Sequence, residues 1–147
     1  PEAPHKAWPI PARVGRVPLT GPRTMFVGDA AAVTDPMTGE GIGQALLSGR
    51  LAAEAILEAA DPVSAYEREA RRELVADDRM ARLLIPLLGR PLIARGALKL
   101  TGATPWTRRN FARWMFEDYP RAMIATPRRW HRGMFTGPGA YPSLPDE

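Results

Sequence analysis

The chain has 147 residues, 45% of them hydrophobic, which is enough for one ordinary domain with a buried core. It has no cysteine, so disulfides, thiolate metal sites and redox dithiols are excluded within these residues, and redox chemistry here would need a bound cofactor. The net charge is +4, yet residues 71–133 hold 14 Arg and Lys against 5 Asp and Glu, so that segment is +9 and the rest is −5.

The first part of the chain is predicted to be extended. Pro9, Pro11 and Pro18 lack the N–H that a central strand needs, so we expect extended chain and a turn there. The apolar run Arg23–Val27, which ends at a glycine, is typical of a short buried strand.

A helix is predicted from Ile42 to about residue 61. Its apolar and small residues recur at spacings of 3, 4 and 7, as on one helix face: Ile42, Ala45, Leu46, Gly49, Ala53, Ile56 and Leu57. We expect this face to pack closely on a neighbour. Pro62 ends the helix, because its ring disfavours helical geometry at the residue before it.

Further helices are predicted downstream. Ser64 followed by Glu67 fits a capping box that starts a helix running to about Leu84. Pro86, Gly89 and Pro91 should break the pattern, and apolar segments 92–100 and 106–119 predict two more helices. The tail from residue 127, rich in Gly and Pro, is expected to be irregular.

Gly28 and Asp29 directly follow the predicted strand. The carboxyl end of a strand is the usual ligand-bearing edge of open α/β folds, and a carboxylate there can accept hydrogen bonds from ligand hydroxyl groups. Asp also commonly caps turns by bonding nearby backbone N–H groups, so a purely structural role stays open.

The segment from Asp35 to Ile42 combines a proline, Pro36, with two glycines, Gly39 and Gly41, just before the predicted helix. Glycines allow backbone to approach a flat ligand, and the unpaired N–H groups of a helix start stabilise negative charge. A glycine-rich turn before a packing helix is the alternative. Glu40 could relay a proton, although its place also suits a carboxylate favoured by the helix dipole.

These motifs together resemble the second FAD-binding motif of the flavoprotein monooxygenase fold, and most closely its geranylgeranyl reductase branch. Aromatic hydroxylases of this fold usually have His where this chain has Ala32, which favours the reductases. The shared elements are Gly28-Asp29-Ala30-Ala31, Asp35-Pro36, Gly39-Glu40-Gly41-Ile42 and Ser48-Gly49-Arg50. The likeness extends backwards to Trp8-Pro9-Ile10-Pro11 and, more weakly, forwards through Tyr66.

The resemblance implies FAD as cofactor, with Asp29 as ligand to the ribityl chain and the glycine turn against the isoalloxazine. The implied cofactor-binding residues are Gly28, Asp29, Pro36, Gly39, Glu40, Gly41 and Ile42. No catalytic residue is assigned. The family's N-terminal G-x-G-x-x-G is absent and the chain opens on Pro1, so we expect a C-terminal part of a longer protein, inactive without its N-terminal portion.

The resulting fold class is α/β. Residues 1–60 would be the C-terminal strand and helix of a Rossmann-like FAD-binding domain, together with the end of a substrate-facing segment. Residues 61–147 would be a helical C-terminal region with an irregular tail.

The activity that the resemblance implies is reduction of carbon–carbon double bonds in a polyprenyl, geranylgeranyl-type substrate, with NAD(P)H as a candidate electron donor. One alternative is an FAD-dependent monooxygenase or halogenase of the same fold. Another is a non-catalytic basic helical module that docks on an anionic membrane, since Leu83–Leu100 is apolar with interspersed Arg and Lys.

Other partners are not expected. His5 and His131 lack further ligands at metal spacing, so no metal site is predicted. Arg pairs interleave with Trp near the C-terminus, but no nucleic-acid-binding motif accompanies them. No signal peptide is visible, and the longest apolar run is far below the roughly 18 residues of a spanning helix. We expect a cytoplasmic protein with peripheral membrane association as an additional feature.

Overall fold

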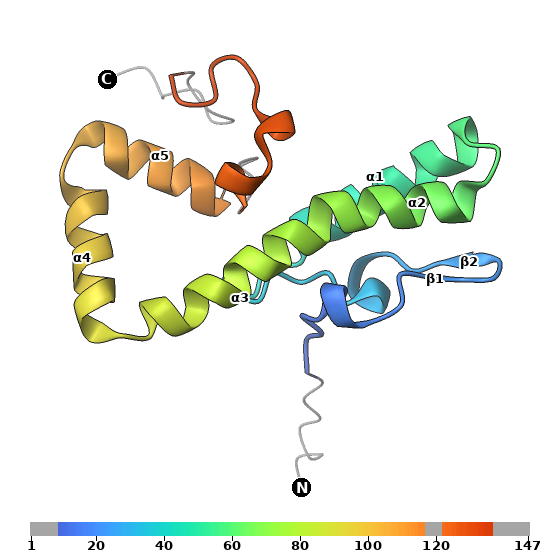
Figure 1. Cartoon of the computed structure of the whole chain (residues 1–147), viewed down its shortest axis with the longest axis horizontal. Helices are drawn as coiled ribbons and strands as arrows, with labels where there is room; N and C mark the ends of the chain where they lie inside the picture. The colour runs from blue at the N-terminus through green and yellow to red at the C-terminus, as the bar shows by residue number, and fades with distance from the viewer. Residues whose placement is uncertain (1–8, 117–121, 137–147) are drawn as a thin grey trace, which may run out of the picture. The chain divides into compact units, whose positions relative to one another are not determined.

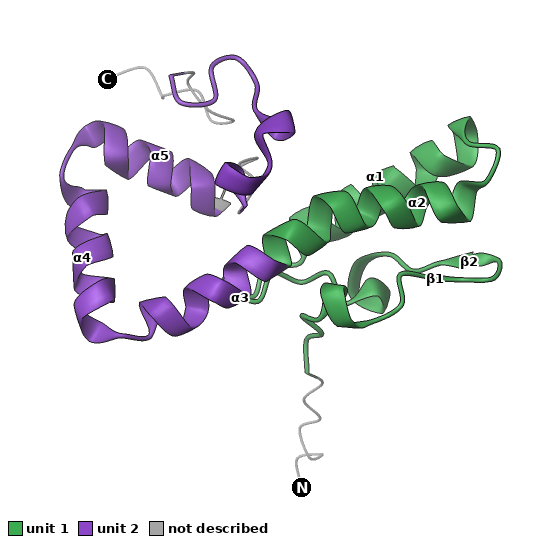
Figure 2. Ribbon diagram, viewed as in Figure 1, with its two compact units in different colours: residues 1–78 green, residues 79–147 purple. Residues whose placement is uncertain are grey.

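The computed structural model describes residues 9–116 and 122–136, and this part is mostly helical with one small two-stranded sheet (Figure 1). The predictions for His5, Trp8, residues 117–119 and the end of the tail lie outside the described residues. The chain forms two compact units, residues 1–78 and 79–147, which are described separately (Figure 2).

Unit 1 begins with short elements, namely η1 (Val14–Arg16), β1 (Thr20–Gly21), β2 (Thr24–Met25) and η2 (Gly28–Ala31). The strands are antiparallel, with Thr20 opposite Met25. Pro22 and Arg23 form the turn between them, where the fixed φ of proline suits the first central position. The prediction of a buried strand over Arg23–Val27 is therefore wrong in extent, because its first residue belongs to a hairpin turn.

The helix predicted at Ile42 is confirmed as α1 (Ile42–Glu58). The face that packs within the unit differs from the one predicted. Ser48, Leu51, Ala52 and Ala55 are buried, whereas the exposed residues of α1 include Ile42, Leu46, Ile56 and Leu57. Within the described residues, most of the predicted apolar face is exposed, although Ala45 and Gly49 are half-buried, so α1 has two apolar sides.

The second helix begins earlier than predicted. In α2 (Pro62–Ala70) the N-cap is Asp61, whose carboxylate accepts the Ser64 N–H at 3.2 Å, with Pro62 at the first helical position. Ser64 is thus inside the helix, and the predicted capping box is wrong. Hydrogen bonds from the Ser64 side chain and backbone lower the pKa of Asp61 below its ordinary value of 3.8.

The helix continues beyond α2 through a π-helical turn, η3 (Arg71–Val75), into α3 (Ala76–Leu88). Pro86 lies inside α3, so the expected break at this proline is wrong. Helix α3 continues for two residues past this proline and ends at Leu88, after which the Gly89 N–H donates to the Ile85 carbonyl at 2.9 Å.

The core of unit 1 lies between α1, α2 and the N-terminal segments. Its buried apolar residues are Val14, Leu19, Ala31, Val33, Leu51, Ala52, Ala55, Ala65, Tyr66, Ala70, Leu74 and Val75. Tyr66 is the largest fully buried side chain, and its hydroxyl donates a short hydrogen bond to the Phe26 carbonyl. Burial raises the pKa of this hydroxyl. The Tyr66 side chain thereby fastens the end of the hairpin to α2.

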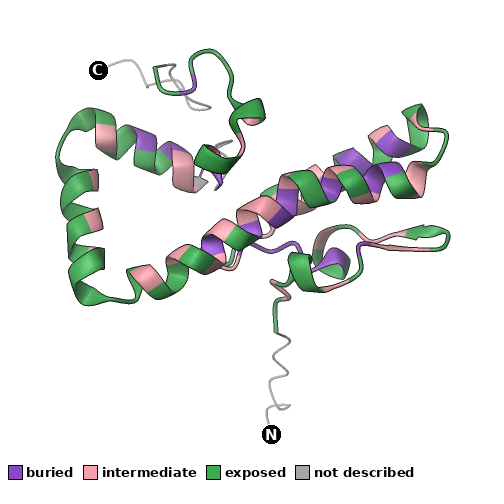
Figure 3. Cartoon of the chain, in the orientation of Figure 1, coloured by how far each residue is buried: buried purple, intermediate pink, exposed green. Residues whose placement is uncertain are grey.

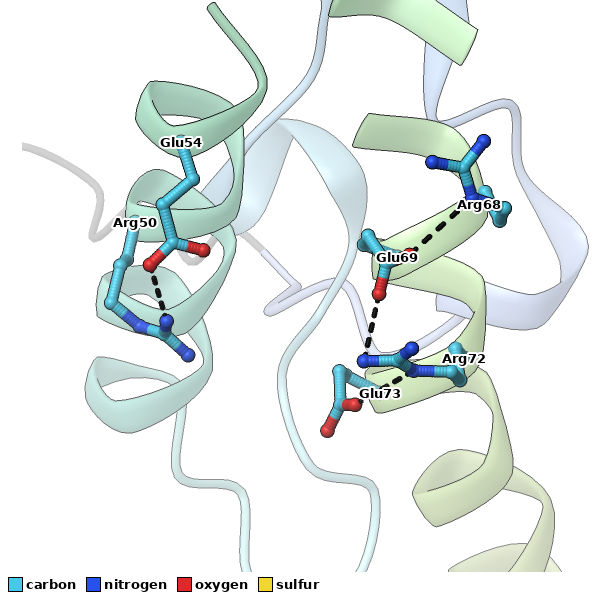
Figure 4. Close-up of polar contacts among 6 residues, drawn as sticks. All are labelled: Arg50, Glu54, Arg68, Glu69, Arg72 and Glu73. Atoms are coloured by element: carbon cyan, nitrogen blue, oxygen red, sulfur yellow. Dashed lines mark hydrogen bonds and ion pairs between the residues drawn. The ribbon is translucent and has the colours of Figure 1, made fainter. Parts of the chain in front are cut away.

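A second bond joins the hairpin to α2. Thr20 donates to Glu67 at 2.9 Å, and Glu67 also pairs with Arg71 at 2.6 Å. Other ion pairs lie on the surface of the same unit, including Arg50–Glu54 at 2.5 Å and Arg72–Glu69 at 2.8 Å (Figure 4). Such exposed pairs stabilise a fold by at most about 1 kcal/mol each, so the apolar core decides the stability of unit 1.

Unit 2 contains the later part of α3, then α4 (Pro91–Gly102), α5 (Pro105–Phe116), η4 (Met123–Ala125) and η5 (Pro127–Arg129). The two helices predicted over 92–100 and 106–119 are therefore present where they are described. The tail is not wholly irregular, since η5 begins at Pro127. No residue of α4 is buried, and Figure 3 shows this helix mostly in the colour of exposed residues.

The α/β class is supported only as a mostly helical chain with a small sheet. A Rossmann-like domain needs a parallel sheet, and β1 and β2 are antiparallel, so that assignment stays a prediction. The division at residue 60 also stays a prediction. Along residues 9–116 and 122–136, no helix is long and apolar enough to cross a lipid bilayer.

We predict that Tyr66→Phe lowers the free energy of unfolding by about 1 kcal/mol, because the ring still fills the core while the Phe26 carbonyl loses its partner. Urea denaturation would measure the change. Thr20→Val, which removes the more exposed bond to Glu67, is the control and should have a smaller effect. A Tyr66→Phe protein as stable as the original would contradict the role of the hydroxyl.

Candidate functional site

The candidate site is the loop from Gly28 to Gly41 with the first turn of α1, all within unit 1. Gly28 starts the loop with φ +55°, a conformation that favours glycine. Its N–H donates to the Ser48 hydroxyl at 3.0 Å, and this hydroxyl donates to the Ala45 carbonyl at 3.0 Å. A Cβ on Gly28 would lie 3.4 Å from the Ala45 Cβ. The loop therefore begins in direct contact with α1.

The loop next reverses at Ala32, which adopts the left-handed conformation with φ 53° although it is not glycine. Its N–H donates to the Asp29 carbonyl at 3.0 Å, and its carbonyl accepts the Arg13 N–H at 2.9 Å. Val33 forms an isolated antiparallel bridge with Ala12. The backbone of residues 12–13 thus pairs with the middle of the loop and fixes its position.

Asp35 fixes the second half of the loop. This buried carboxylate accepts the Thr38 hydroxyl at 2.5 Å and the backbone N–H groups of Thr38 at 3.1 Å and Met37 at 3.3 Å. The Asp35 backbone N–H also donates to the Glu40 carbonyl at 2.8 Å, and its carbonyl accepts the Gly39 N–H at 2.9 Å. The glycine turn is consequently formed around one acidic side chain.

Three residues converge beside the start of α1. A Cβ on Gly41 would lie 3.1 Å from the Thr34 hydroxyl oxygen and 3.8 Å from Oδ1 of Asp29. The first distance is tighter than ordinary contact, so only glycine fits at position 41 without displacement. Thr34 is 2% exposed, and its hydroxyl has no hydrogen-bond partner in the described structure.

The buried Oε1 of Gln44, in the first turn of α1, also lacks a partner among the described residues. Unpaired buried polar atoms are uncommon and costly, so these two groups suit a ligand. The N-terminus of α1 has no side-chain cap, and its ladder begins with the Ala45 N–H donating to the Gly41 carbonyl at 2.8 Å. The N–H groups of the preceding helical residues can therefore bind a ligand with negative charge.

The structure brings Gly28, Asp29 and Gly41 together near the N-terminal end of α1. It places Pro36, Gly39 and Glu40 on the turn around Asp35. Asp29 and Glu40 are exposed, and Ile42 is 75% exposed. The Gly39 φ of +74° favours glycine, but the space around it is open. The cofactor-binding role of all seven predicted residues stays a prediction.

Sequence reasoning did not assign four residues that organise the site: Thr34, Asp35, Gln44 and Ser48. The motif contained a usable signal for two of them, because Asp before Pro-x-Thr is typical of an Asx-type turn, and Ser48 lies three residues after Ala45 on the buried helix face. No comparable signal marks Thr34, whose burial results from the reversal at Ala32.

Comparison with known proteins finds relatives of one class, the reductases. No family model and no solved structure matches the chain. A digeranylgeranylglycerophospholipid reductase of Thermoplasma volcanium is 35% identical over 83 residues, 46% of this chain and 21% of the relative. A second such reductase, from Methanopyrus kandleri, is 45% identical over 58 residues, 35% of this chain and 16% of the relative.

A menaquinone reductase of Mycolicibacterium smegmatis is 56% identical over 36 residues, 24% of this chain and 9% of the relative. These relatives are all named as reductases. The matches support a relationship to the geranylgeranyl reductase family, which confirms the resemblance seen in the motifs. The matches span about a fifth or less of the length of these relatives.

We predict that Asp35→Ala lowers the free energy of unfolding by about 2 kcal/mol or more, because several donors of the turn lose a buried acceptor. Chemical denaturation would measure this loss. Glu40→Ala, in the same turn but exposed, is the control and should change stability by less than about 0.5 kcal/mol. Equal effects of the two substitutions would contradict the organising role of Asp35.

Proposed function

We propose that this chain is the part of an FAD-dependent oxidoreductase that holds the flavin, and that the complete protein reduces carbon–carbon double bonds of a polyprenyl chain. The observation that carries this proposal is the convergence of Asp29, Gly41 and the unpartnered Thr34 hydroxyl beside the uncapped N-terminus of α1. The family relationship supports it independently.

The residues fit a flavin in the types of groups that they present. Asp29 offers an exposed acceptor for ribityl hydroxyl groups, and Thr34 offers a buried hydroxyl that needs a partner. Gly41 leaves its backbone uncovered by a side chain, as an approach to a planar ring requires. The orphaned Oε1 of Gln44 can accept a hydrogen bond from a ring N–H.

The two-electron reduced form of the flavin, once bound, would supply the hydride for reduction of a carbon–carbon double bond, with NAD(P)H or another donor as the source of its electrons. The role of the protein is electrostatic. The first amides of α1, around Ile42 and Gly43, form the positive end of a 17-residue helix. They would stabilise the negative charge of a reduced isoalloxazine and so favour electron storage.

The substrate class follows from the relatives. Their names specify a digeranylgeranyl glycerophospholipid in several cases and menaquinone in one, and both kinds of molecule contain polyprenyl chains. We therefore propose a long polyprenyl chain as the reacting part. Product analysis separates this activity from that of a monooxygenase or halogenase, because reduction adds two hydrogen atoms and no oxygen or halogen.

We predict that Asp29→Ala in the complete protein weakens FAD binding about tenfold, because ligand hydroxyl groups lose a charged acceptor. The measurement is the flavin absorbance retained after desalting, followed by FAD titration. Glu58→Ala removes an exposed carboxylate at the last residue of α1 and should leave occupancy unchanged. Full flavin retention by Asp29→Ala would count against the assignment.

Thr34→Val gives a sharper test, because it replaces the unpartnered hydroxyl with a methyl group of similar size. We expect the flavin-free protein to become more stable, by about 1 kcal/mol, since an unsatisfied buried group is removed. FAD affinity should fall several-fold if the ligand pairs with that hydroxyl. Thermal unfolding with and without FAD measures both effects, and a loss of stability in the absence of FAD would indicate an ordinary protein partner for Thr34.

A further inference from the structure

Unit 2 carries a long basic stretch that the proposed function does not use. Residues 79–116 contain eight basic residues and no Asp or Glu. The basic residues are Arg79, Arg82, Arg90, Arg95, Lys99, Arg108, Arg109 and Arg113. A stretch with one sign of charge attracts a partner of the opposite sign and repels its own kind.

Helix α4 is also unusually apolar for a helix without a buried residue. Leu92 is 82% exposed, Leu98 71% and Leu100 70%. The spacing of Leu92, Arg95 and Lys99 places them on one side of the helix, with Leu98 and Leu100 flanking it. We call these five residues the α4 surface.

The cations of the α4 surface differ from those of unit 1. The ion pairs of α1, α2 and η3 neutralise their arginines, as Figure 4 shows for Arg50, Arg68 and Arg72. Arg95 and Lys99 have no ion-pair partner in the described part of the chain. Full positive charge and exposed leucine thus occur together on the same side of one helix.

We propose that the α4 surface binds anionic phospholipid membranes peripherally, with α4 lying in the plane of the interface. Its leucines would enter the acyl boundary, while the flexible stems of Arg95 and Lys99 carry their charges to lipid phosphates. Trp106, 53% exposed at the start of α5, has a ring suited to the headgroup level. With 12 residues, α4 is too short to cross the bilayer.

Charge complementarity selects this partner. An uncharged apolar partner would gain from the leucines but would leave two cations without counterions, whereas an anionic lipid surface accommodates both. This inference does not depend on the proposed flavin chemistry. A protein without FAD could still bind vesicles, and a flavoprotein could fail to do so.

The test is co-sedimentation of the protein expressed from its complete reading frame with two kinds of vesicle, one of phosphatidylcholine alone and one with phosphatidylglycerol added. We expect binding to the anionic vesicles only. Binding should weaken strongly on going to about 1 M salt, where the Debye length is about 3 Å. Equal binding to both vesicles, or none to either, would overturn the proposal.

Two matched double variants test whether the membrane binds at the α4 surface. Arg95→Gln with Lys99→Gln should weaken anionic-vesicle binding about 25-fold, since each basic residue near such a surface contributes about fivefold. Arg16→Gln with Arg23→Gln removes the same charge from exposed sites in unit 1 and should have little effect. Equal losses in the two double variants would overturn the assignment to α4.

Leu92→Ser should weaken the same binding about tenfold, because a leucine that inserts is lost. Leu57→Ser is its control, since Leu57 on α1 is also 82% exposed. Sedimentation velocity without vesicles tests a competing occupant. A dimer that only Leu92→Ser dissociates, in a protein that ignores anionic vesicles, would assign the surface to a second copy and contradict the membrane proposal.

Discussion

The hydrogen bond from the Gly28 N–H to the Ser48 hydroxyl is the contact on which the candidate site depends. It joins residues 20 positions apart and fixes the start of the loop on the buried side of α1. From there the chain reverses at Ala32 and returns to the N-terminus of the same helix through the turn around Asp35. The loop is closed at both ends on one helix, so its polar groups converge without a large sheet beneath them.

The two units use similar residue types for different purposes. In unit 1, leucine, valine and alanine fill a core around Tyr66, and most surface arginines have carboxylate partners nearby. In unit 2, the leucines of α4 are exposed and the cations beside them have no acidic neighbours in sequence. The first arrangement stabilises a fold by itself, whereas the second is the surface for which we propose a partner with both apolar and anionic groups.

The sequence predicted the start of α1 and the family resemblance better than the packing of the helices. Periodicity located the start of α1 at Ile42, and the glycine motif identified the family, because both depend on local pattern. The prediction of the packing face of α1 was wrong because apolar residues lie on both sides of this helix. A hydrophobic pattern alone does not say which side packs on α2. Pro86 was read as a break, yet α3 continues for two residues beyond it and ends at Leu88. The burial of Thr34 follows from one left-handed alanine, which no propensity predicts.

The connection between α1 and α2, only three residues long, has a consequence for the order of folding. Most core contacts of this pair join residues close in sequence, which cost little loop entropy and form early. The contacts of Gly28 and Arg13 belong to irregular segments, so we expect them to open before the helix pair unfolds. We therefore expect local opening of the 28–41 loop to require less free energy than unfolding of the helix pair. A ligand that binds only the closed loop would favour that state over the open one. Ligand binding would then complete the folding of unit 1.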